Sequence, residues 1–119
     1  YSSTVEKQLT DYIKPQECGG HVGVRWFEIS DSPAGGLAKN ARGIRIELDK
    51  PRMVTVLPVT SEALADATHN IYVKRSGTTV VTIDAIHRGV GTASCGPDTL
   101  DQYKIKPGTY KITWTQLAL

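Results

Sequence analysis

The chain has 119 residues, 39% of them hydrophobic and 22% charged, and a formal net charge of +2 at pH 7. This length fits a single domain, residues 1–119, that buries roughly two-thirds of the surface its unfolded chain exposes. The balanced, scattered charges argue against a disordered chain and against a nucleic-acid partner. No apolar run approaches the roughly 20 residues that a membrane-spanning helix needs, so no membrane partner is expected.

The start of the chain and its cysteines indicate its context. The first residue is Tyr1 rather than an initiator methionine, which leads us to expect a processed chain or a segment of a longer protein. Cys18 and Cys95 are the only two cysteines, too few for a disulfide-stapled scaffold or for a zinc site without histidines. We therefore expect free thiols and a reducing, cytoplasmic location.

The first half of the chain favours strands over helices. Residues 1–16 are polar and without period, which is typical of an extended entry segment. Residues 21–29 are predicted to form a strand covered in part on both faces. In residues 44–48 isoleucine and leucine alternate with charged residues, which predicts a half-buried strand that Pro51 ends before another begins at residues 53–57.

The second half adds one short helix and further strands. Residues 61–66 are the best helical candidate, with Thr60 or Ser61 as the N-cap. Residues 71–74 and 78–86 are predicted to form a hairpin around Gly77. Further strands are predicted at residues 102–106 and 109–117. These elements together predict an all-β fold, an antiparallel β-sandwich.

Residues 82–99 are the first candidate for function. The stretch begins as a strand and then becomes an irregular loop with three glycines, one proline, one cysteine and two carboxylates. Irregular loops carry function more often than the elements that hold them. A pair of acids drawn from Asp84, Asp98 and Asp101, which lie in or near this stretch, would suit glycoside hydrolysis, but acids at turns more often cap backbone N–H groups. Cys95 or Ser94 could act as a nucleophile with His87 as its base, although a structural thiol is the simpler interpretation.

Two other kinds of site leave alternatives open. A metal site built from histidines and cysteines lacks the close ligand pairs typical of zinc, and hydrogen-bonded histidines are the simpler interpretation. Sugar binding would need exposed aromatic rings, for which Trp26 and Tyr103 are candidates. Tyr110 and Trp114 share one face of a predicted strand, which favours core packing. The residues considered for metal binding are His21, His69, His87, Cys18 and Cys95.

Several motifs resemble one enzyme family. Residues 12–19 read YIKPQECG and resemble the Y-I-R-P-Q-E-N-G segment of the lac-type bacterial β-galactosidases of glycoside hydrolase family two. The sequence VRW at residues 24–26 resembles the V-R-W that follows there. Ile83, Asp84 and His87 with the glycines after them resemble the family's I-D-x-x-H-x-G-V-G, and residues 103–114 are similar to its closing strand pair.

The resemblance implies that the chain is the C-terminal part of the last, small-chain domain of such an enzyme. That domain is a β-supersandwich related to galactose mutarotase. The family hydrolyses terminal β-D-galactosides with two glutamates on a separate β/α barrel, so the resemblance places no catalytic residue in this chain and implies that the chain alone is inactive. It also implies that Mg and Na bind on the barrel side, so that this chain holds no cofactor and no metal ligand. The implied partners are the rest of the parent chain with its barrel, the galactoside substrate, and further copies in a homo-oligomer.

The resemblance also assigns the loop. It implies that Thr92, Ser94 and Cys95 lie at the rim of the substrate pocket, where well-known members have an Asp-Asp-Ser-Trp sequence whose Trp is the floor for the sugar. Cys95 offers far less apolar area than an indole. The residues expected to structure the loop are Asp84, His87, Gly89 and Gly91.

Cys18 and Cys95 both stand where the sequence departs from the family pattern. Cys18 occupies the position of the usual Asn, and Cys95 that of the sugar-stacking Trp. We therefore expect the two loops that carry them to be neighbours. The alternative function is a free-standing carbohydrate-binding or adhesion module, which would present Trp26 and Tyr103 on one exposed patch.

Overall fold

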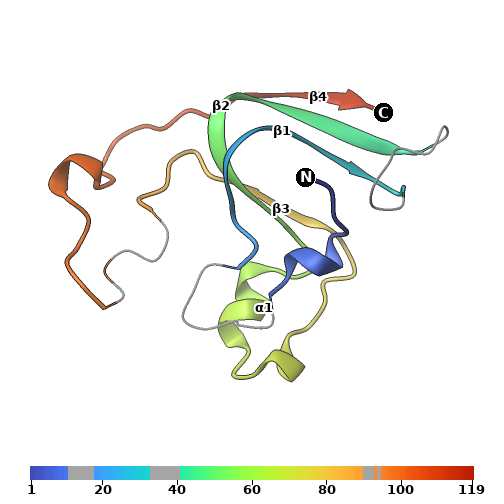
Figure 1. The fold of residues 1–119 in the computed structure, drawn as a ribbon, viewed down its shortest axis with the longest axis horizontal. Coiled ribbons are helices and arrows are strands. Elements are labelled where there is room, and N and C mark those ends of the chain that lie inside the picture. Colours follow the sequence, from blue (N-terminus) through green and yellow to red (C-terminus); the bar gives the residue numbers. More distant parts are fainter. Residues whose placement is uncertain (11–17, 33–40, 90–92, 94) are drawn as a thin grey trace.

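The strands of the computed structural model form one antiparallel sheet of four strands (Figure 1). The long strand β2 (Gly43–Leu57) lies at its centre, and β1 (His21–Ser30) pairs along one edge of it. Along the other edge, β4 (Trp114–Ala118) and then β3 (Val80–Ile83) pair with β2 one after the other. The predicted all-β, antiparallel fold is confirmed, and the second sheet of a sandwich stays a prediction. The structure describes residues 1–10, 18–32, 41–89, 93 and 95–119.

The strand β2 is continuous where the sequence predicted two strands separated by Pro51. Its pairing with β1 changes register, because Val24 lies opposite Arg52 whereas Trp26 lies opposite Glu47. The stretch of β2 between these two pairs is longer than the stretch of β1 that faces it, so β2 bulges there. Proline is accepted at a bulge because no ladder hydrogen bond needs its missing N–H. The prediction that Pro51 ends the strand was therefore wrong.

The segment between β3 and β4, residues 84–113, leaves the sheet and is called the arm. Figure 1 shows it extending away from the sheet, with the 3-10 helix η3 (Asp101–Tyr103) at its far end. The strand predicted at residues 102–106 was wrong, because the Tyr103 N–H closes a local turn by donating to the Leu100 carbonyl at 2.9 Å. The strand predicted at residues 109–117 begins only at Trp114.

Three short helices lie near one end of the sheet (Figure 1). The helix α1 (Ser61–Asp66) forms where it was predicted, and the Thr60 hydroxyl caps it by accepting from the Ala63 N–H at 3.2 Å. The others are the 3-10 turns η1 (Glu6–Gln8) and η2 (Asn70–Tyr72).

The hairpin predicted around Gly77 does not form. Residues 70–72 are helical, and β3 pairs with β2 instead of with residues 71–74. Gly77 nevertheless has the positive φ expected of it, +73°. The Ser76 N–H donates to the Pro58 carbonyl at 2.9 Å, which ties this turn to the end of β2. Pairing with a long central strand therefore replaced the local pairing that the spacing indicated.

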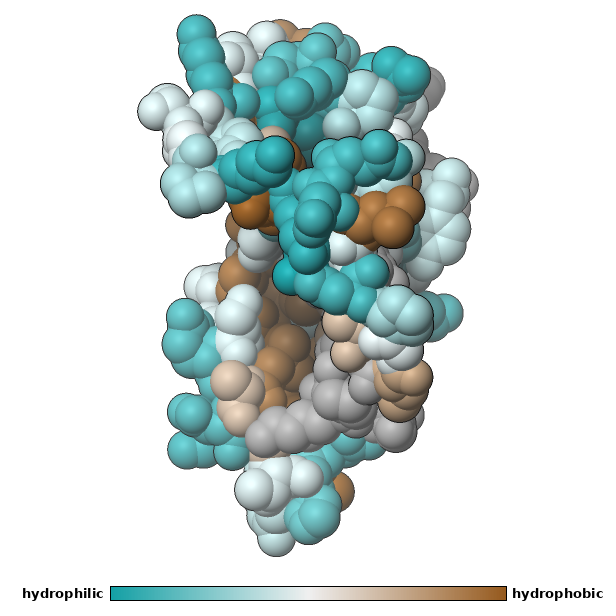
Figure 2. All heavy atoms as spheres, turned by 90° about the vertical axis from the view of Figure 1, so that its left-hand side faces the viewer, coloured by the Kyte–Doolittle hydropathy of each residue, from teal (hydrophilic) through white to brown (hydrophobic). Residues whose placement is uncertain are grey.

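The chain leaves much apolar surface uncovered. Its accessible surface is 8684 Å², against about 6,300 Å² for a compact folded monomer of this mass. Its radius of gyration, 16.0 Å, also exceeds the value of about 13.5 Å for a compact domain of this length. Figure 2 shows the side that carries the arm, which is hollowed, with hydrophobic residues inside the hollow and hydrophilic side chains above it. The described buried hydrophobic residues are Cys18, Ile46, Met53, Val54, Leu57, Val59 and Ala67.

The exposed apolar residues concentrate toward the C-terminal part of the chain. All five residues of β4 are exposed. Tyr110 and Trp114, which were predicted to pack in the core, are 43% and 50% exposed. That prediction was wrong for the isolated chain because no second layer of the described residues covers β4 and the end of the arm.

Two glycines before and within β1 allow a test of how the N-terminal segment packs on the sheet. Gly19 and Gly23 have φ values of +70° and +77°, so alanine at either position costs about 1 kcal/mol in backbone conformation. A Cβ on Gly19 would lie 2.7 Å from the Gln8 carbonyl oxygen and 2.8 Å from Leu57 Cδ2, whereas a Cβ on Gly23 meets nothing within 4 Å.

We predict that Gly19→Ala lowers the free energy of unfolding by at least about 1 kcal/mol more than Gly23→Ala, because overpacking adds to the conformational cost. Thermal and urea unfolding of the 119-residue chain, followed by circular dichroism, measures the difference. Equal losses in the two variants would contradict the packing of residue 8 against Gly19.

Candidate functional site

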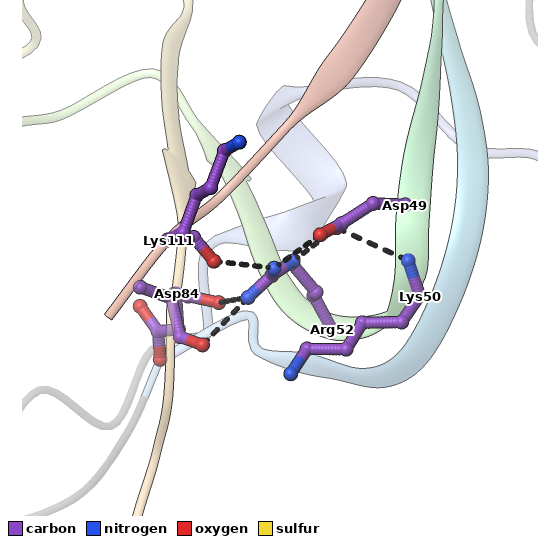
Figure 3. A network of polar contacts seen from close by, with 6 residues as sticks. Asp49, Lys50, Arg52, Asp84 and Lys111 are labelled. Carbon is purple, nitrogen blue, oxygen red and sulfur yellow. Dashed lines mark hydrogen bonds and ion pairs between the residues drawn. The ribbon is translucent and has the colours of Figure 1, made fainter. Parts of the chain in front are cut away.

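The arm is attached to the sheet through the side chain of Arg52. Its Nε and one terminal nitrogen donate to the two carboxylate oxygens of Asp49 at 2.7 and 2.8 Å. The other terminal nitrogen donates to the Ala85 carbonyl at 2.6 Å and to the Asp84 carbonyl at 3.4 Å. The terminal nitrogen that binds Asp49 also donates to the Lys111 carbonyl at 3.0 Å. Figure 3 shows these bonds converging on one guanidinium from both ends of the arm.

The position of Arg52 explains why a charged residue is buried here. The ladder with β4 ends at Leu48 and the ladder with β3 begins at Val54, so a gap opens between them along the edge of β2. Arg52 is 4% exposed and lies in this gap. The Asp49 carboxylate neutralises it, and the carbonyls use its remaining donors, as a buried cation requires. We call this cluster of Arg52, Asp49 and the carbonyls of residues 84, 85 and 111 the Arg52 junction.

The junction also changes the ionisation of its two charged groups. The hydrogen bond from Arg52 lowers the pKa of the Asp49 carboxyl. The same bond raises the pKa of the Arg52 guanidinium. Both shifts favour the charged pair, because the hydrogen bond forms best when both groups are ionised.

A second group of charges lies further along the arm. Arg88 forms an ion pair with Asp98, and its Nε donates to the Thr99 hydroxyl at 3.0 Å. Asp98 also accepts from the Thr99 N–H at 2.7 Å and pairs with Lys104 Nζ at 3.3 Å. Lys104 in turn pairs with Asp101 at 2.7 Å. These bonds join the two ends of the loop that carries Cys95.

The four residues that were expected to structure this loop differ from one another in their surroundings, and their role in the loop stays a prediction. Asp84 is tied to the sheet through its backbone, since its N–H donates to the Met53 carbonyl at 3.0 Å and its own carbonyl accepts from Arg52. His87 is exposed at the start of the loop. Gly89 has a φ of +133°, which favours glycine. Gly91 lies outside the described residues.

Of the three residues expected at the pocket rim, the structure describes only Cys95. Its side chain is exposed and its thiol is free. Thr92 and Ser94 lie outside the described residues. The expected position of this loop beside a sugar therefore stays a prediction.

The two cysteines have different surroundings. Cys18 is buried and free, and its sulfur accepts from the Thr10 N–H at 3.4 Å and lies 3.3 Å from the Thr10 hydroxyl. Cys95 is exposed in the arm. The expected proximity of the two loops remains a prediction.

The histidines and acids do not gather into a metal site in the part of the chain that the structure describes, where no three His, Cys, Asp or Glu side chains come together. His21 Nε2 lies 2.7 Å from the Gln8 side-chain oxygen, and its ring contacts Tyr1. The His69 ring contacts Tyr72. Among the described helices, none is long and apolar enough to cross a membrane.

The two aromatic residues considered for sugar binding lie on different elements. Trp26 is 52% exposed on β1, and the Arg45 guanidinium lies over its ring at 4.0 Å from the centroid. Arg45 is held there by ion pairs to Glu28 and Glu47. Tyr103 is 63% exposed but belongs to η3, in the arm. One face of the Trp26 ring is therefore occupied by a cation.

The described residues also surround a hollow of about 870 Å³, which lies between residues 1–8 and one side of β1. Tyr1, Gln8, His21 and Trp26 are among its lining residues, and none of the lining residues belongs to the arm. Cys95 is therefore not among the described residues that line this hollow.

Sequence reasoning missed the residues that hold the arm. Arg52 stands directly before the apolar residues Met53 and Val54 and close to Asp49. Lys50 lies almost as close, so the local sequence does not mark Arg52 as the cation that binds the arm. Arg88 and Asp98 flank the glycine-rich loop at both ends, a spacing that agrees with an ion pair across the loop but does not demand one.

Comparisons with known proteins agree on one family. The family model described as beta galactosidase small chain matches residues 1–115. The β-galactosidases of Actinobacillus pleuropneumoniae and Streptococcus thermophilus are 30% and 33% identical over 94% and 83% of the chain. The β-galactosidase small subunit of Latilactobacillus sakei is 30% identical over 82% of the chain. The chain spans about a tenth of the first two relatives and 32% of the small subunit.

The Arg52 junction predicts the effect of two substitutions. Arg52→Met leaves the carbonyls of Asp84, Ala85 and Lys111 without their donor, whereas Asp49→Asn keeps Arg52 and those bonds. We therefore predict that both variants lower the thermal midpoint, Arg52→Met because the carbonyls lose their donor and Asp49→Asn because the buried charge of Arg52 is left uncompensated. The lowered pKa of Asp49 means that its contribution is complete above the ordinary carboxyl pKa of about 4 and is lost as the pH falls further.

The stability difference between the wild type and Asp49→Asn should accordingly shrink below about pH 4. Thermal unfolding of the 119-residue chain at a series of pH values measures this. A difference that stays constant from neutral pH to about pH 3 would contradict an ionised Asp49 at the junction.

Proposed function

Since the chain belongs to the β-galactosidase small chain family, we propose that it is a C-terminal β-sandwich domain of an enzyme that hydrolyses terminal β-D-galactosides. The observation that carries the proposal is the family match over residues 1–115. The named relatives support the reaction, because they are β-galactosidases of which the chain covers about a tenth. The domain forms one part of a galactose mutarotase-like β-supersandwich in that enzyme.

The proposed partner of the exposed apolar surface is the remainder of the parent chain, including its barrel domain. The excess of accessible surface over a compact monomer is of the size that protein interfaces bury. Large exposed apolar patches mark such contacts. Part of this surface lies on β4 and at η3 in the arm, where Leu100, Tyr103, Trp114 and Leu117 are 67%, 63%, 50% and 46% exposed.

The proposed contribution of this domain to the active site is a loop at the pocket rim and not a catalytic group. Cys95, with Ser94 and Thr92, would border the sugar, and Asp84, His87, Gly89 and Gly91 would structure the loop. The exposed side chain of Cys95 supports this role, since a rim residue must be accessible to substrate. The catalytic carboxylates and the Mg and Na ions of the parent enzyme would be held by the barrel side.

The parent enzyme is further proposed to be a homo-oligomer located in the cytoplasm. Free thiols at Cys18 and Cys95 fit a reducing compartment. A free-standing carbohydrate-binding module receives less support, because Arg45 covers one face of Trp26 and Tyr103 lies on another element.

The proposal predicts that the 119-residue chain alone does not hydrolyse o-nitrophenyl β-D-galactoside. The reason is that the catalytic carboxylates would belong to another domain. The assay compares the isolated chain with the full-length protein at equal molar concentration. Turnover by the isolated chain would contradict the proposal, and so would a full-length protein that hydrolyses no β-galactoside.

The rim role of Cys95 predicts the effect of restoring an aromatic ring. In the full-length enzyme, Cys95→Trp should lower KM severalfold with a smaller change in kcat, because an indole offers more apolar area to the sugar. Cys95→Ser, which keeps the size of the side chain, is the matched control. KM values that stay the same for Cys95→Trp across several galactosides would show that the loop does not reach the pocket.

A further inference from the structure

Charged side chains join the two ends of the loop that carries Cys95. Arg88 precedes the loop and Asp98 follows it, and the two form an ion pair. The Thr99 hydroxyl accepts a second bond from Arg88 Nε at 3.0 Å, so the guanidinium is held by two adjacent residues of the far end. Two anchoring points fix its orientation better than one.

Asp98 is placed to receive this cation. Its Oδ1 accepts from the Thr99 N–H at 2.7 Å, and its Oδ2 pairs with Lys104 Nζ at 3.3 Å. Lys104 is itself fixed by Asp101 at 2.7 Å, one turn earlier in η3. The carboxylate is therefore oriented by the Thr99 N–H and by Lys104, which follows η3, in addition to Arg88. We call the group of Arg88, Asp98, Thr99 and Lys104 the loop clamp.

The loop clamp and the Arg52 junction act on successive parts of the arm. The junction fixes the carbonyls of Asp84 and Ala85 where the arm leaves β3. Only two residues separate Ala85 from Arg88, so the first side of the loop starts from a fixed point. The ion pair of Arg88 with Asp98 then ties the far end of the loop, three residues after Cys95, to this fixed point.

We propose that Arg88 is a positioning residue for galactoside binding, which acts through Asp98 to hold the Cys95 loop at the pocket rim. This inference rests on the proposed function, because it assumes that the loop borders the substrate. The side chains of Arg88 and Asp98 are 42% and 47% exposed. Exposed ion pairs of this kind contribute modestly, so the expected loss of affinity is about two- to fivefold.

The kinetic test uses the full-length enzyme with o-nitrophenyl β-D-galactoside. Arg88→Gln and Asp98→Asn should each raise KM about two- to fivefold with a smaller change in kcat, and the double variant should be no worse than either single one. Arg88→Lys keeps the charge and should restore part of the affinity. Arg75→Gln is the matched control, since Arg75 pairs with Glu6 at 3.2 Å on the surface outside the arm.

A second measurement tests the clamp independently of substrate. Hydrogen–deuterium exchange of peptides spanning residues 88–99 should be faster in Arg88→Gln and Asp98→Asn than in the wild type and in Arg75→Gln. Unchanged exchange in both clamp variants would overturn the proposal, because the loop would then not be held by the pair.

The combined results separate this inference from the proposed function. Faster exchange with a raised KM supports the clamp and its role. If Cys95→Trp alters KM while the clamp variants do not, the clamp proposal is overturned and the rim loop stands. If neither Cys95→Trp nor the clamp variants alter KM, the rim loop itself is overturned, and the positioning role with it.

Discussion

The buried guanidinium of Arg52 is the interaction on which the arrangement of the chain depends. Along one edge, the long strand β2 pairs first with β4 and then with β3. Arg52 lies in the gap between these two ladders. Without a donor in this gap, the carbonyls of Asp84, Ala85 and Lys111 would be left without their bonds to the guanidinium. One side chain therefore lets a single strand support both ends of a long irregular segment.

This constraint explains why the arm can be irregular and still be positioned. Between its two anchored ends the described residues of the arm form one short 3-10 helix, and several of its apolar residues are exposed. The ion pairs of Asp98 with Arg88 and Lys104 also join the two ends of the loop that carries Cys95. In a β-galactosidase, we infer that the anchored arm would present one loop to the substrate and its apolar residues to the neighbouring domain.

The sequence allowed the fold class and some elements to be predicted, but not the pairing. The helix at Ser61 and its Thr60 cap follow from local chemistry, and they form as predicted. Pro51 and the turn at Gly77 misled the prediction, because long-range pairing with β2 outweighs local signals and a bulge tolerates proline. Trp114 was expected in a core that this chain does not complete. The hydrophobic pattern marks a residue for burial without saying which part of a protein buries it.

The candidate site was predictable only in part, because local patterns do not reveal partners that are distant in sequence. The family motif around Ile83 and His87 located the loop, but no local pattern marked Arg52 as the residue that binds its base. Buried cations are satisfied by groups distant in sequence, here residue 111 as well as residues 84 and 85.

The most direct test of the account is whether a galactoside protects the thiol of Cys95 in the full-length protein. Cys95 is exposed and Cys18 is buried, so alkylation by N-ethylmaleimide, followed by peptide mass spectrometry, distinguishes the two. The account predicts that a non-hydrolysed thiogalactoside slows alkylation of Cys95 in a saturable manner. An alkylation rate of Cys95 that is independent of the thiogalactoside, in an enzyme that binds it, would contradict the placement of this loop at the pocket.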